Sequence, residues 1–302
     1  MSLNRREFLK YGALISASSL LPMDLISANP KNRLCILHTN DTHSRIDPFP
    51  TTDSKYPNMG GVLGRMELIQ QIRNEEKNVL LFDAGDIFQG TPYFNYFKGE
   101  IEIKLMSKMR YDAATMGNHD FDAGLDGFEK QLKYAHFPFI TSNYDFKNTV
   151  LEGQTIENKI FEKEDWKVGV FGLGIELDGL VQQVQFRETK YLDPIEIAQE
   201  QIKQLKRKGC NLIICLSHLG YKYENTKISD VILAKSCPDL NLIIGGHTHS
   251  FLEEGHLIQH IDGRETLITQ TGWGGIKLGK ILIEQNQNRI SFQSCKNQKI
   301  SV

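Results

Sequence analysis

The stretch Tyr111-Asp112-Ala113-Ala114-Thr115-Met116-Gly117-Asn118-His119-Asp120-Phe121-Asp122 decides how this sequence folds. Its first half is mostly small and apolar, which predicts a buried strand, and Gly117 marks the point where that strand stops. Asn118 and His119 then follow the carboxyl end of the strand, where open α/β sheets bind their ligands. An Asn beside a His also occurs in ordinary turns, so this stretch alone does not identify a site.

The same pattern recurs in four other apolar runs, each of which ends in Asp or His residues. Leu34 to His38 leads into Thr39 to His43, Val79 to Phe82 into Asp83 to Asp86, Asn211 to Leu216 into Ser217 and His218, and Leu240 to Ile244 into Gly245 to His249. The chain has nine histidines, and most of them lie in these positions. A single histidine at a strand end is usually structural, but packing does not explain a repeated set. The pattern therefore favours a functional role for these strand-end residues.

In chain order, these motifs resemble the signature of the binuclear metallophosphoesterases. The motifs are Asp-x-His, Gly-Asp-x-x-x-Gly, Gly-Asn-His-Asp, a later single His, and Gly-His-x-His. The closer resemblance is to the catalytic domain of the 5′-nucleotidases, and it rests on Leu37 to His43, Gly85 to Pro92 and Tyr111 to Asp122. It covers residues 33–285. The ordered set is specific, although any one motif would be weak.

The resemblance implies two divalent transition-metal ions and assigns their ligands. One ion would be bound by Asp41, His43, Asp86 and His249, and the other by Asp86, Asn118, His218 and His247. Such mixed ligands suit Zn, Mn, Fe, Co or Ni better than Ca. Asp86 would bridge two ions about 3.5–4 Å apart, and a water bound to both would lose a proton and attack phosphorus as hydroxide.

His119 adjoins a ligand but is not a ligand in the family that the sequence resembles. The resemblance implies that it faces the substrate, stabilises the transition state and protonates the leaving oxygen as a general acid. A carboxylate would keep its imidazolium charged, and the resemblance places that carboxylate at Asp122, with Asp120 as the nearer rival. Arg45 is a candidate substrate contact, with a solvated surface arginine as an equal alternative.

The other polar and aromatic candidates are interpreted as structural. His38 is expected to help build the turn after the first strand, and Asp83 to bond the Gly85 turn. Three further histidines fit no motif and are expected at the surface or in loops: His136, His256 and His260. The indoles of Trp166 and Trp273 are of a kind that stacks on a base, but packing is the preferred interpretation for both. Five cysteines without a C-x-x-C motif predict no disulfide framework.

Beyond residue 33, helix and strand patterns alternate, which predicts one α/β domain. Helices are predicted at Gly61–Glu75, Ile101–Met109, Leu125–Tyr134 and Pro194–Lys208, the last with Asp193 as N-cap and Gly209 as stop. Further strands are predicted at Val168–Leu173, Thr266–Thr269 and Leu278–Glu284. The resemblance implies that residues 29–302 form a two-sheet αββα sandwich of the metallophosphoesterase type.

Residues 1–28 predict a targeting segment. Asn4 to Lys10 resembles the twin-arginine export motif, and the apolar stretch from Tyr11 to Leu21 is too short to span a bilayer. We therefore expect cleavage near Ala28, a periplasmic or extracellular protein, and no stable membrane insertion afterwards. The alternative is a basic amphipathic helix of a cytosolic protein. With 35 basic and 37 acidic side chains, the chain has no general basic excess for nucleic acid.

The resemblance predicts hydrolysis of phosphate monoesters, with nucleoside 5′-monophosphates as the leading substrates. A 5′-nucleotidase also carries a C-terminal domain that binds the base, whereas this sequence stops at Val302. We therefore expect either a broad scavenging phosphatase or a separate subunit of the C-terminal type. The alternatives are an exported cyclic-nucleotide phosphodiesterase, a thiosulfohydrolase on the same scaffold, and a non-catalytic binding protein that holds metal.

Overall fold

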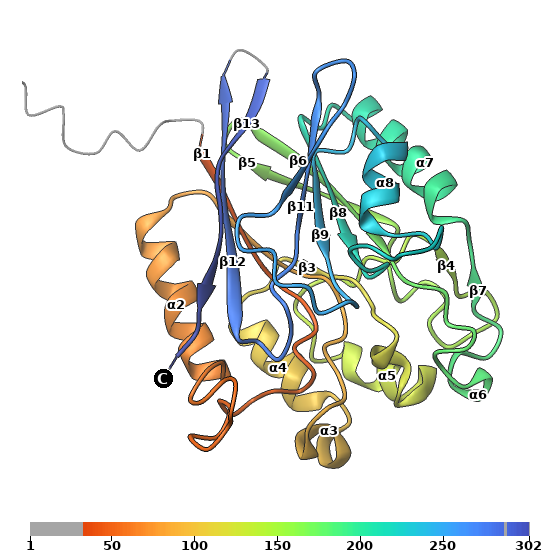
Figure 1. Cartoon of the computed structure of the whole chain (residues 1–302). Coiled ribbons are helices and arrows are strands. Elements are labelled where there is room, and N and C mark those ends of the chain that lie inside the picture. Colours follow the sequence, from red (N-terminus) through yellow and green to blue (C-terminus); the bar gives the residue numbers. More distant parts are fainter. Residues whose placement is uncertain (1–32, 287–288, 302) are drawn as a thin grey trace, which may run out of the picture. The chain divides into compact units, whose positions relative to one another are not determined.

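Two β-sheets form the centre of the described chain, which comprises residues 33–286 and 289–301 of a computed structural model (Figure 1). The targeting segment predicted at residues 1–28 lies outside the described residues. Within the described ranges, no helix is both long enough and apolar enough to span a lipid bilayer.

The first sheet is built around β1 (Arg33–Thr39), which pairs in parallel with one neighbour and antiparallel with the other. Its strand order is β13 (Arg289–Lys299), β12 (Lys277–Asn286), β1, β2 (Val79–Asp83) and β3 (Ala113–Ala114). β1, β2 and β3 are parallel, so their carboxyl ends lie at the same edge. The loops that leave this edge carry the first three polar motifs.

The second sheet has a parallel centre and antiparallel edges. Its strand order is β10 (His256–Gln259), β11 (Glu265–Thr269), β9 (Leu242–Gly245), β8 (Leu212–Ser217), β6 (Trp166–Leu173) and β5 (Asn158–Lys163). A small third sheet pairs β4 (Tyr144–Asp145) with β7 (Lys190–Tyr191). The loops after β8 and β9 carry the remaining polar motifs.

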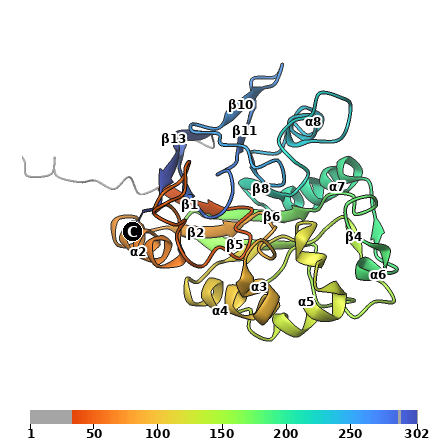
Figure 2. The same cartoon turned by 60° about the horizontal axis from the view of Figure 1, so that its bottom comes forward.

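Three buried apolar clusters hold these layers together. Alternate residues of β1 face opposite sides: Ile36 packs between the two sheets with Val170 and Ile214, whereas Leu37 packs outward against helices. The helices on that outer side are α2 (Val62–Glu75), α4 (Glu100–Lys108) and α5 (Gly124–Leu132). On the far side of the second sheet lie α7 (Pro194–Arg207) and α8 (Asp230–Ser236). Figure 2 shows the strands between these two groups of helices. The predicted αββα sandwich is confirmed.

The helix boundaries follow the sequence signals closely. The side chain of Asp193 accepts hydrogen bonds from the backbone N–H groups of Ile195 and Glu196, each at 2.9 Å, as the predicted N-cap of α7 should. Short helices that the sequence analysis did not predict complete the described chain: α3 (Pro92–Phe97), η3 (His119–Phe121), α6 (Gln183–Phe186) and α8 (Asp230–Ser236).

Two strand predictions need correction. The run from Tyr111 was expected to be a full strand, but only Ala113 and Ala114 pair with β2, because the chain then turns away towards the polar motif. The sequence analysis also did not predict β4, β5, β7, β10 or the long strand β13. β13 lies at the edge of its sheet and alternates polar side chains with few apolar ones, so its sequence carries little hydrophobic signal.

Candidate metal centre

The seven predicted metal ligands lie on loops that follow five strand ends. Asp41 and His43 follow β1, Asp86 follows β2, Asn118 follows β3, His218 follows β8, and His247 and His249 follow β9. Six of them form two groups whose ligand atoms lie within 4.8 Å of one another: Asp41, His43 and His249 in the first, and Asp86, His218 and His247 in the second. The residues that the family resemblance predicted to share a site therefore lie close together.

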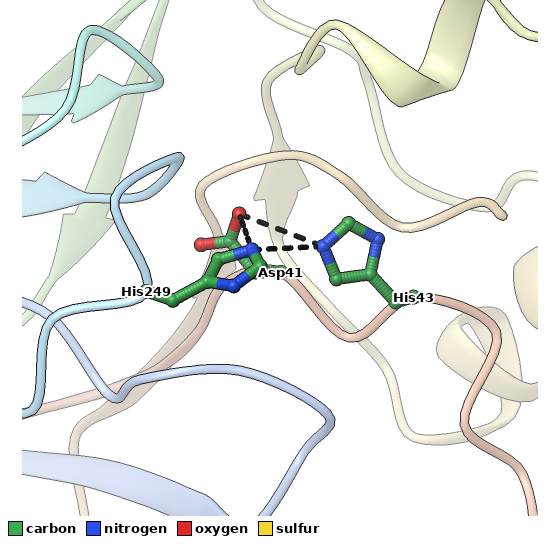
Figure 3. A group of neighbouring side chains, drawn as sticks. All are labelled: Asp41, His43 and His249. Carbon is green, nitrogen blue, oxygen red and sulfur yellow. Dashed lines mark hydrogen bonds and ion pairs between the residues drawn. The ribbon is translucent and has the colours of Figure 1, made fainter. Parts of the chain in front are cut away.

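The first group brings two imidazole nitrogens to one carboxylate oxygen (Figure 3). Nε2 of His43 lies 3.0 Å from Nε2 of His249. Oδ1 of Asp41 lies 3.4 Å from Nε2 of His249 and 4.0 Å from that of His43. Nitrogen and carboxylate donors that point at a common position form a suitable face for a divalent transition metal.

The second group contains a buried nitrogen that needs a partner. Nδ1 of His218 lies 2.7 Å from the carbonyl oxygen of Ala84, so Nδ1–H donates there and Nε2 carries a lone pair. This Nε2 faces Oδ2 of Asp86 at 3.1 Å, yet it has no hydrogen-bond partner among the described residues. Two acceptors that face each other in a buried place need a proton or a cation between them, so the site fits a metal ion.

The protonation states of the site also suit a cation. Burial lowers the pKa of His218, but the charges of Asp86 and Asp41 outweigh burial and raise it to about 10. Burial opposes ionisation of Asp86, but His218 and His43 hold the pKa of this carboxyl well below its usual range. Burial lowers the pKa of His43, and it lowers that of His247 to about 4. Neutral imidazoles and ionised carboxylates are the forms that bind metal, so His43, His247 and Asp86 already have the required form. The raised pKa of His218 reflects a proton held between its Nε2 and Asp86, which a bound cation would replace.

Asp86 lies where the two groups meet. Its Oδ2 is 3.1 Å from Nε2 of His218 in the second group and 3.9 Å from Nε2 of His43 in the first. Asp41, a member of the first group, also lies near the second group, because its Oδ1 is 3.9 Å from Nε2 of His218. Asn118 joins the second group through its Oδ1, which lies 2.9 Å from Nδ1 of His247. This arrangement places a carboxylate between two candidate cation positions.

The two carboxylates considered as partners of His119 have different surroundings. Oδ2 of Asp122 lies 2.8 Å from Nδ1 of His119, and this hydrogen bond raises the pKa of the imidazole. Asp120 is fully buried and accepts hydrogen bonds from the backbone N–H groups of Gly117, Asp86, Ile87 and Phe88 at 2.8–3.1 Å. Asp120 thus holds the turn after β2, whereas Asp122 orients the ring of His119.

Several residues expected to be structural can now be placed. Asp83 accepts a hydrogen bond from the Gly85 N–H at 2.9 Å, as predicted. His38 lies in the first strand, as expected, and is fully buried within β1, where Nε2 lies 3.3 Å from Oγ1 of Thr269. Its strand continues to Thr39, and burial lowers its pKa to about 3.

The other histidines, Trp166 and Arg45 match their predicted positions only in part. His136 is exposed, and Trp166 is buried in β6, as predicted. His256 is not in a loop but in β10, with Nδ1 2.9 Å from the Tyr221 hydroxyl. His260 bonds Thr266 through Nε2 at 3.0 Å. The guanidinium of Arg45 lies 4.2 Å from the centroid of the Phe49 ring, so it is not a freely solvated arginine, and its contact with substrate stays a prediction.

Sequence analysis missed the residues that support the ligands from behind. Asn40 donates from Nδ2 to Oδ2 of Asp41 at 2.5 Å and to the Gly272 carbonyl at 2.7 Å, while its Oδ1 accepts from the backbone of Thr271 at 2.8 Å. Asp230 is fully buried and accepts a 2.5 Å hydrogen bond from the hydroxyl of Ser217, next to His218. The only signal for Asn40 was its place beside Asp41, and nothing in the sequence pointed to Asp230.

Comparison with known proteins agrees with this geometry. Residues 35–251 match the model of the calcineurin-like phosphoesterase family, so the chain belongs to the calcineurin-like metallophosphoesterases. Within that class it is homologous to the N-terminal domain of 5′-nucleotidases. The predicted family is confirmed.

Three relatives illustrate this similarity. The venom 5′-nucleotidase of Crotalus adamanteus is 33% identical over 270 residues, which is 82% of this chain and 44% of that protein. Human 5′-nucleotidase is 33% identical over 282 residues, with coverages of 83% and 46%. The solved structure of a 5′-nucleotidase precursor from Thermus thermophilus superposes with a TM-score of 0.78 at 29% identity, covering 89% of this chain and 55% of that one. The chain spans about half the length of these relatives.

Proposed function

We propose that this protein hydrolyses phosphate monoesters, with nucleoside 5′-monophosphates as its substrate class, at a centre that binds two divalent transition-metal ions. The observation that carries the proposal is the pair of adjoining ligand groups with Asp86 between them, in which Nε2 of His218 has no hydrogen-bond partner among the described residues. The relatives named 5′-nucleotidases support the substrate class.

The chain's own side chains would hold the two ions. Asp41, His43 and His249, with Asp86, would bind one ion, and Asp86, His218 and His247, with Asn118, would bind the other. When bound, two such ions activate water and offset the charge of the phosphoryl oxygens. Behind the ligands, Asn40 and Asp120 fix the backbone and side chains of the loops that carry Asp41 and Asp86.

His119 would supply the proton that the leaving alkoxide needs. Nδ1 of His119 is bonded to Asp122, so Nε2 is the nitrogen that can reach a substrate, and the side chain is 37% exposed. Because Asp122 raises the pKa of His119, the ring keeps its proton towards neutral pH. The His119 ring also stands edge-on to that of His43 at 5.4 Å, close to the first ligand group. This arrangement suits a general acid beside the reacting phosphate.

The test is turnover by purified protein of defined metal content. Release of phosphate would be measured with AMP and phenyl phosphate, formation of the monoester product with a cyclic nucleotide and a diester, and release of sulfate with a thiosulfonate of the R–S–SO3− type. His136→Ala serves as a control histidine variant outside the site. We expect two metal equivalents and preferential hydrolysis of the monoesters. Preferential cleavage of the cyclic nucleotide, the diester or the thiosulfonate would refute the substrate class. Metal binding without any turnover would favour the binding-protein alternative.

We further propose that the protein is exported by the twin-arginine route, on the basis of Arg5 and Arg6 in their motif. The expectation of a separate base-recognition subunit also stays a prediction. Mixing this chain with an exported protein that resembles a nucleotidase C-terminal domain should lower KM for AMP more than KM for a nitrophenyl ester. A micromolar KM for AMP with this chain alone would contradict the need for such a subunit.

A further inference from the structure

The candidate ligand His249 is held differently from two other imidazoles of the centre. His43 and His218 are fixed through Nδ1, which lies 3.3 Å from the Phe88 carbonyl in one and 2.7 Å from the Ala84 carbonyl in the other. For His249, polar interactions within the described part of the chain involve only Nε2, which faces His43 and Asp41. Its side chain is also 40% exposed, whereas that of His218 is fully buried. Hydrogen bonding at Nδ1 therefore does not set the orientation of the His249 ring.

An aromatic contact restricts this ring instead. The imidazole of His249 lies nearly parallel to the indole of Trp273, with an interplanar angle of 13° and centroids 5.8 Å apart. Phe49 meets the indole edge-on at 5.4 Å and 85°, and Tyr56 does so at 6.3 Å and 78°. The indole is thus set by two further rings before it contacts His249.

The backbone on either side of Trp273 is tied to the same ligand group. The N–H of Gly274 donates to the carbonyl of Asp41 at 2.7 Å, and the N–H of Gly272 donates to the carbonyl of Ser250 at 2.9 Å. Ser250 directly follows His249. The loop that carries Trp273 is therefore bonded to the chain at Asp41 and next to His249, two of the three ligands of the first group. These bonds position the indole relative to the imidazole.

We propose that Trp273 is a positioning residue for the first metal position. Its indole holds the His249 ring so that Nε2 points at the ion bound with Asp41 and His43. This inference rests on the proposed two-metal function. His249 has a left-handed backbone, with φ at 51°. In the described part of the chain, the nearly parallel stack takes the place of the Nδ1 hydrogen bond that usually orients a ligand histidine.

The stack also bears on how the indole is used. One face of the Trp273 indole is covered by the His249 ring, so that face is not open to a nucleobase. Packing was the preferred interpretation of Trp273 from the sequence, and the structure gives this packing a purpose at the centre.

The experiment compares metal binding by Trp273→Ala and Trp273→Phe with that of the unsubstituted chain. Metal-free protein is titrated with Zn²⁺ in a calorimeter, and Tyr96→Ala, which truncates an aromatic side chain that is 81% exposed, serves as the control. We expect Trp273→Ala to weaken one of the two equivalents by about tenfold or more and to spare the other, and Trp273→Phe to restore most of the loss. Tyr96→Ala should bind like the unsubstituted chain.

Fluorescence gives a readout that does not depend on catalysis. The chain has two tryptophans, and the other, Trp166, is buried between the sheets. Co²⁺ at the first position should quench Trp273 strongly, so quenching should largely disappear in Trp273→Phe.

The inference would be wrong if the unsubstituted chain binds two equivalents of Zn²⁺ and Trp273→Ala binds both with the same affinities. That result would leave the proposed function standing. Equal weakening in Trp273→Ala and Trp273→Phe would also overturn the inference, because stacking would then not be the cause. An unsubstituted chain that binds no metal would overturn both proposals.

Discussion

Gly117 is the position where one added methyl group should damage the metal centre most directly. A Cβ at Gly117 would lie 2.2 Å from Oδ1 of Asp86, 2.5 Å from the Asp86 nitrogen and 2.6 Å from Cε1 of His218. Ordinary Cβ contacts begin at 3.4 Å, so the carboxylate would have to retreat by the difference, about 1.2 Å. It has little freedom to do so, because Oδ1 of Asp86 accepts a 2.8 Å hydrogen bond from the His119 N–H.

The expected cost of Gly117→Ala follows from that displacement. Overpacking a dense interior costs about 1–3 kcal/mol, which for a domain of this size lowers Tm by about 2–12 °C. A misplacement near 1 Å in a catalytic site costs about 100-fold in rate. We therefore expect kcat/KM to fall by about 100-fold, together with weaker binding of both metal equivalents.

The assay combines phosphate release from 4-nitrophenyl phosphate, metal content and differential scanning calorimetry. Gly153→Ala is the matched control, because it also adds one methyl group to a glycine, but a Cβ at Gly153 would meet nothing within 4 Å. Gly153 has φ at 72°, so its substitution costs backbone strain alone and should leave activity intact. A Gly117→Ala variant with two tightly bound ions and more than half of the original kcat/KM would refute the reasoning.

Four further predictions test other parts of the proposal. Asp86→Ala should remove both metal equivalents, and a variant that keeps one at the original affinity would show that Asp86 does not bridge. His119→Ala should keep its metal but lose about 10²–10⁴-fold in kcat with phenyl phosphate, and less with nitrophenyl phosphate, whose leaving group needs little protonation; equal losses would contradict the acid role. Asp122→Asn replaces the carboxylate that accepts from Nδ1 of His119 with a neutral amide, which weakens the interaction that raises the pKa of His119, so the basic limb of the kcat/KM profile should move to lower pH. The ion pair between His119 and Asp122 stabilises the fold fully below the unfolded pKa of histidine, about 6.5, and this stabilisation is lost as pH rises through the higher folded pKa. A basic limb that does not move in Asp122→Asn would show that Asp122 does not raise the pKa of His119. Replacing Arg5 and Arg6 with Lys should leave uncleaved protein in the cytoplasm on cell fractionation, and normal export would exclude the twin-arginine route.

The strand ends of this protein could be predicted because two sequence signals coincide there, an apolar run and the polar residues that follow it. Each core strand is a short apolar run, as in Leu212 to Leu216, and each run stops at polar residues that a buried sheet would not otherwise contain, as at Ser217 and His218. Parallel strands end at a common edge, so these residues had to lie close together. The strand ends and the polar residues after them follow from that argument, whereas the two-sheet sandwich and the two ligand groups were implied by the family resemblance.

The parts that sequence analysis missed depend on partners far away along the chain. Asn40 orients Asp41 by bonding to Gly272 and Thr271, and Trp273 stacks on His249 from the loop between β11 and β12. No local pattern encodes such pairs. The strand β13 was missed for a different reason, because an edge strand needs only one apolar face and here carries few apolar side chains.

The backbone of the ligand loops explains why the centre needs so much support. Five of the predicted ligands have a left-handed backbone, with φ between 48° and 70°: Asp41, His43, Asp86, His247 and His249. Each such conformation costs about 1–3 kcal/mol in a residue with a side chain and persists only where its surroundings impose it. Those surroundings are long-range hydrogen bonds, such as the Asp41 N–H to the Gly85 carbonyl at 2.9 Å and the His247 N–H to Oδ1 of Asp41 at 3.0 Å. The loops therefore hold one another in conformations that none would adopt alone. The strain in their backbones lowers stability, and in return the ligand side chains have fixed positions.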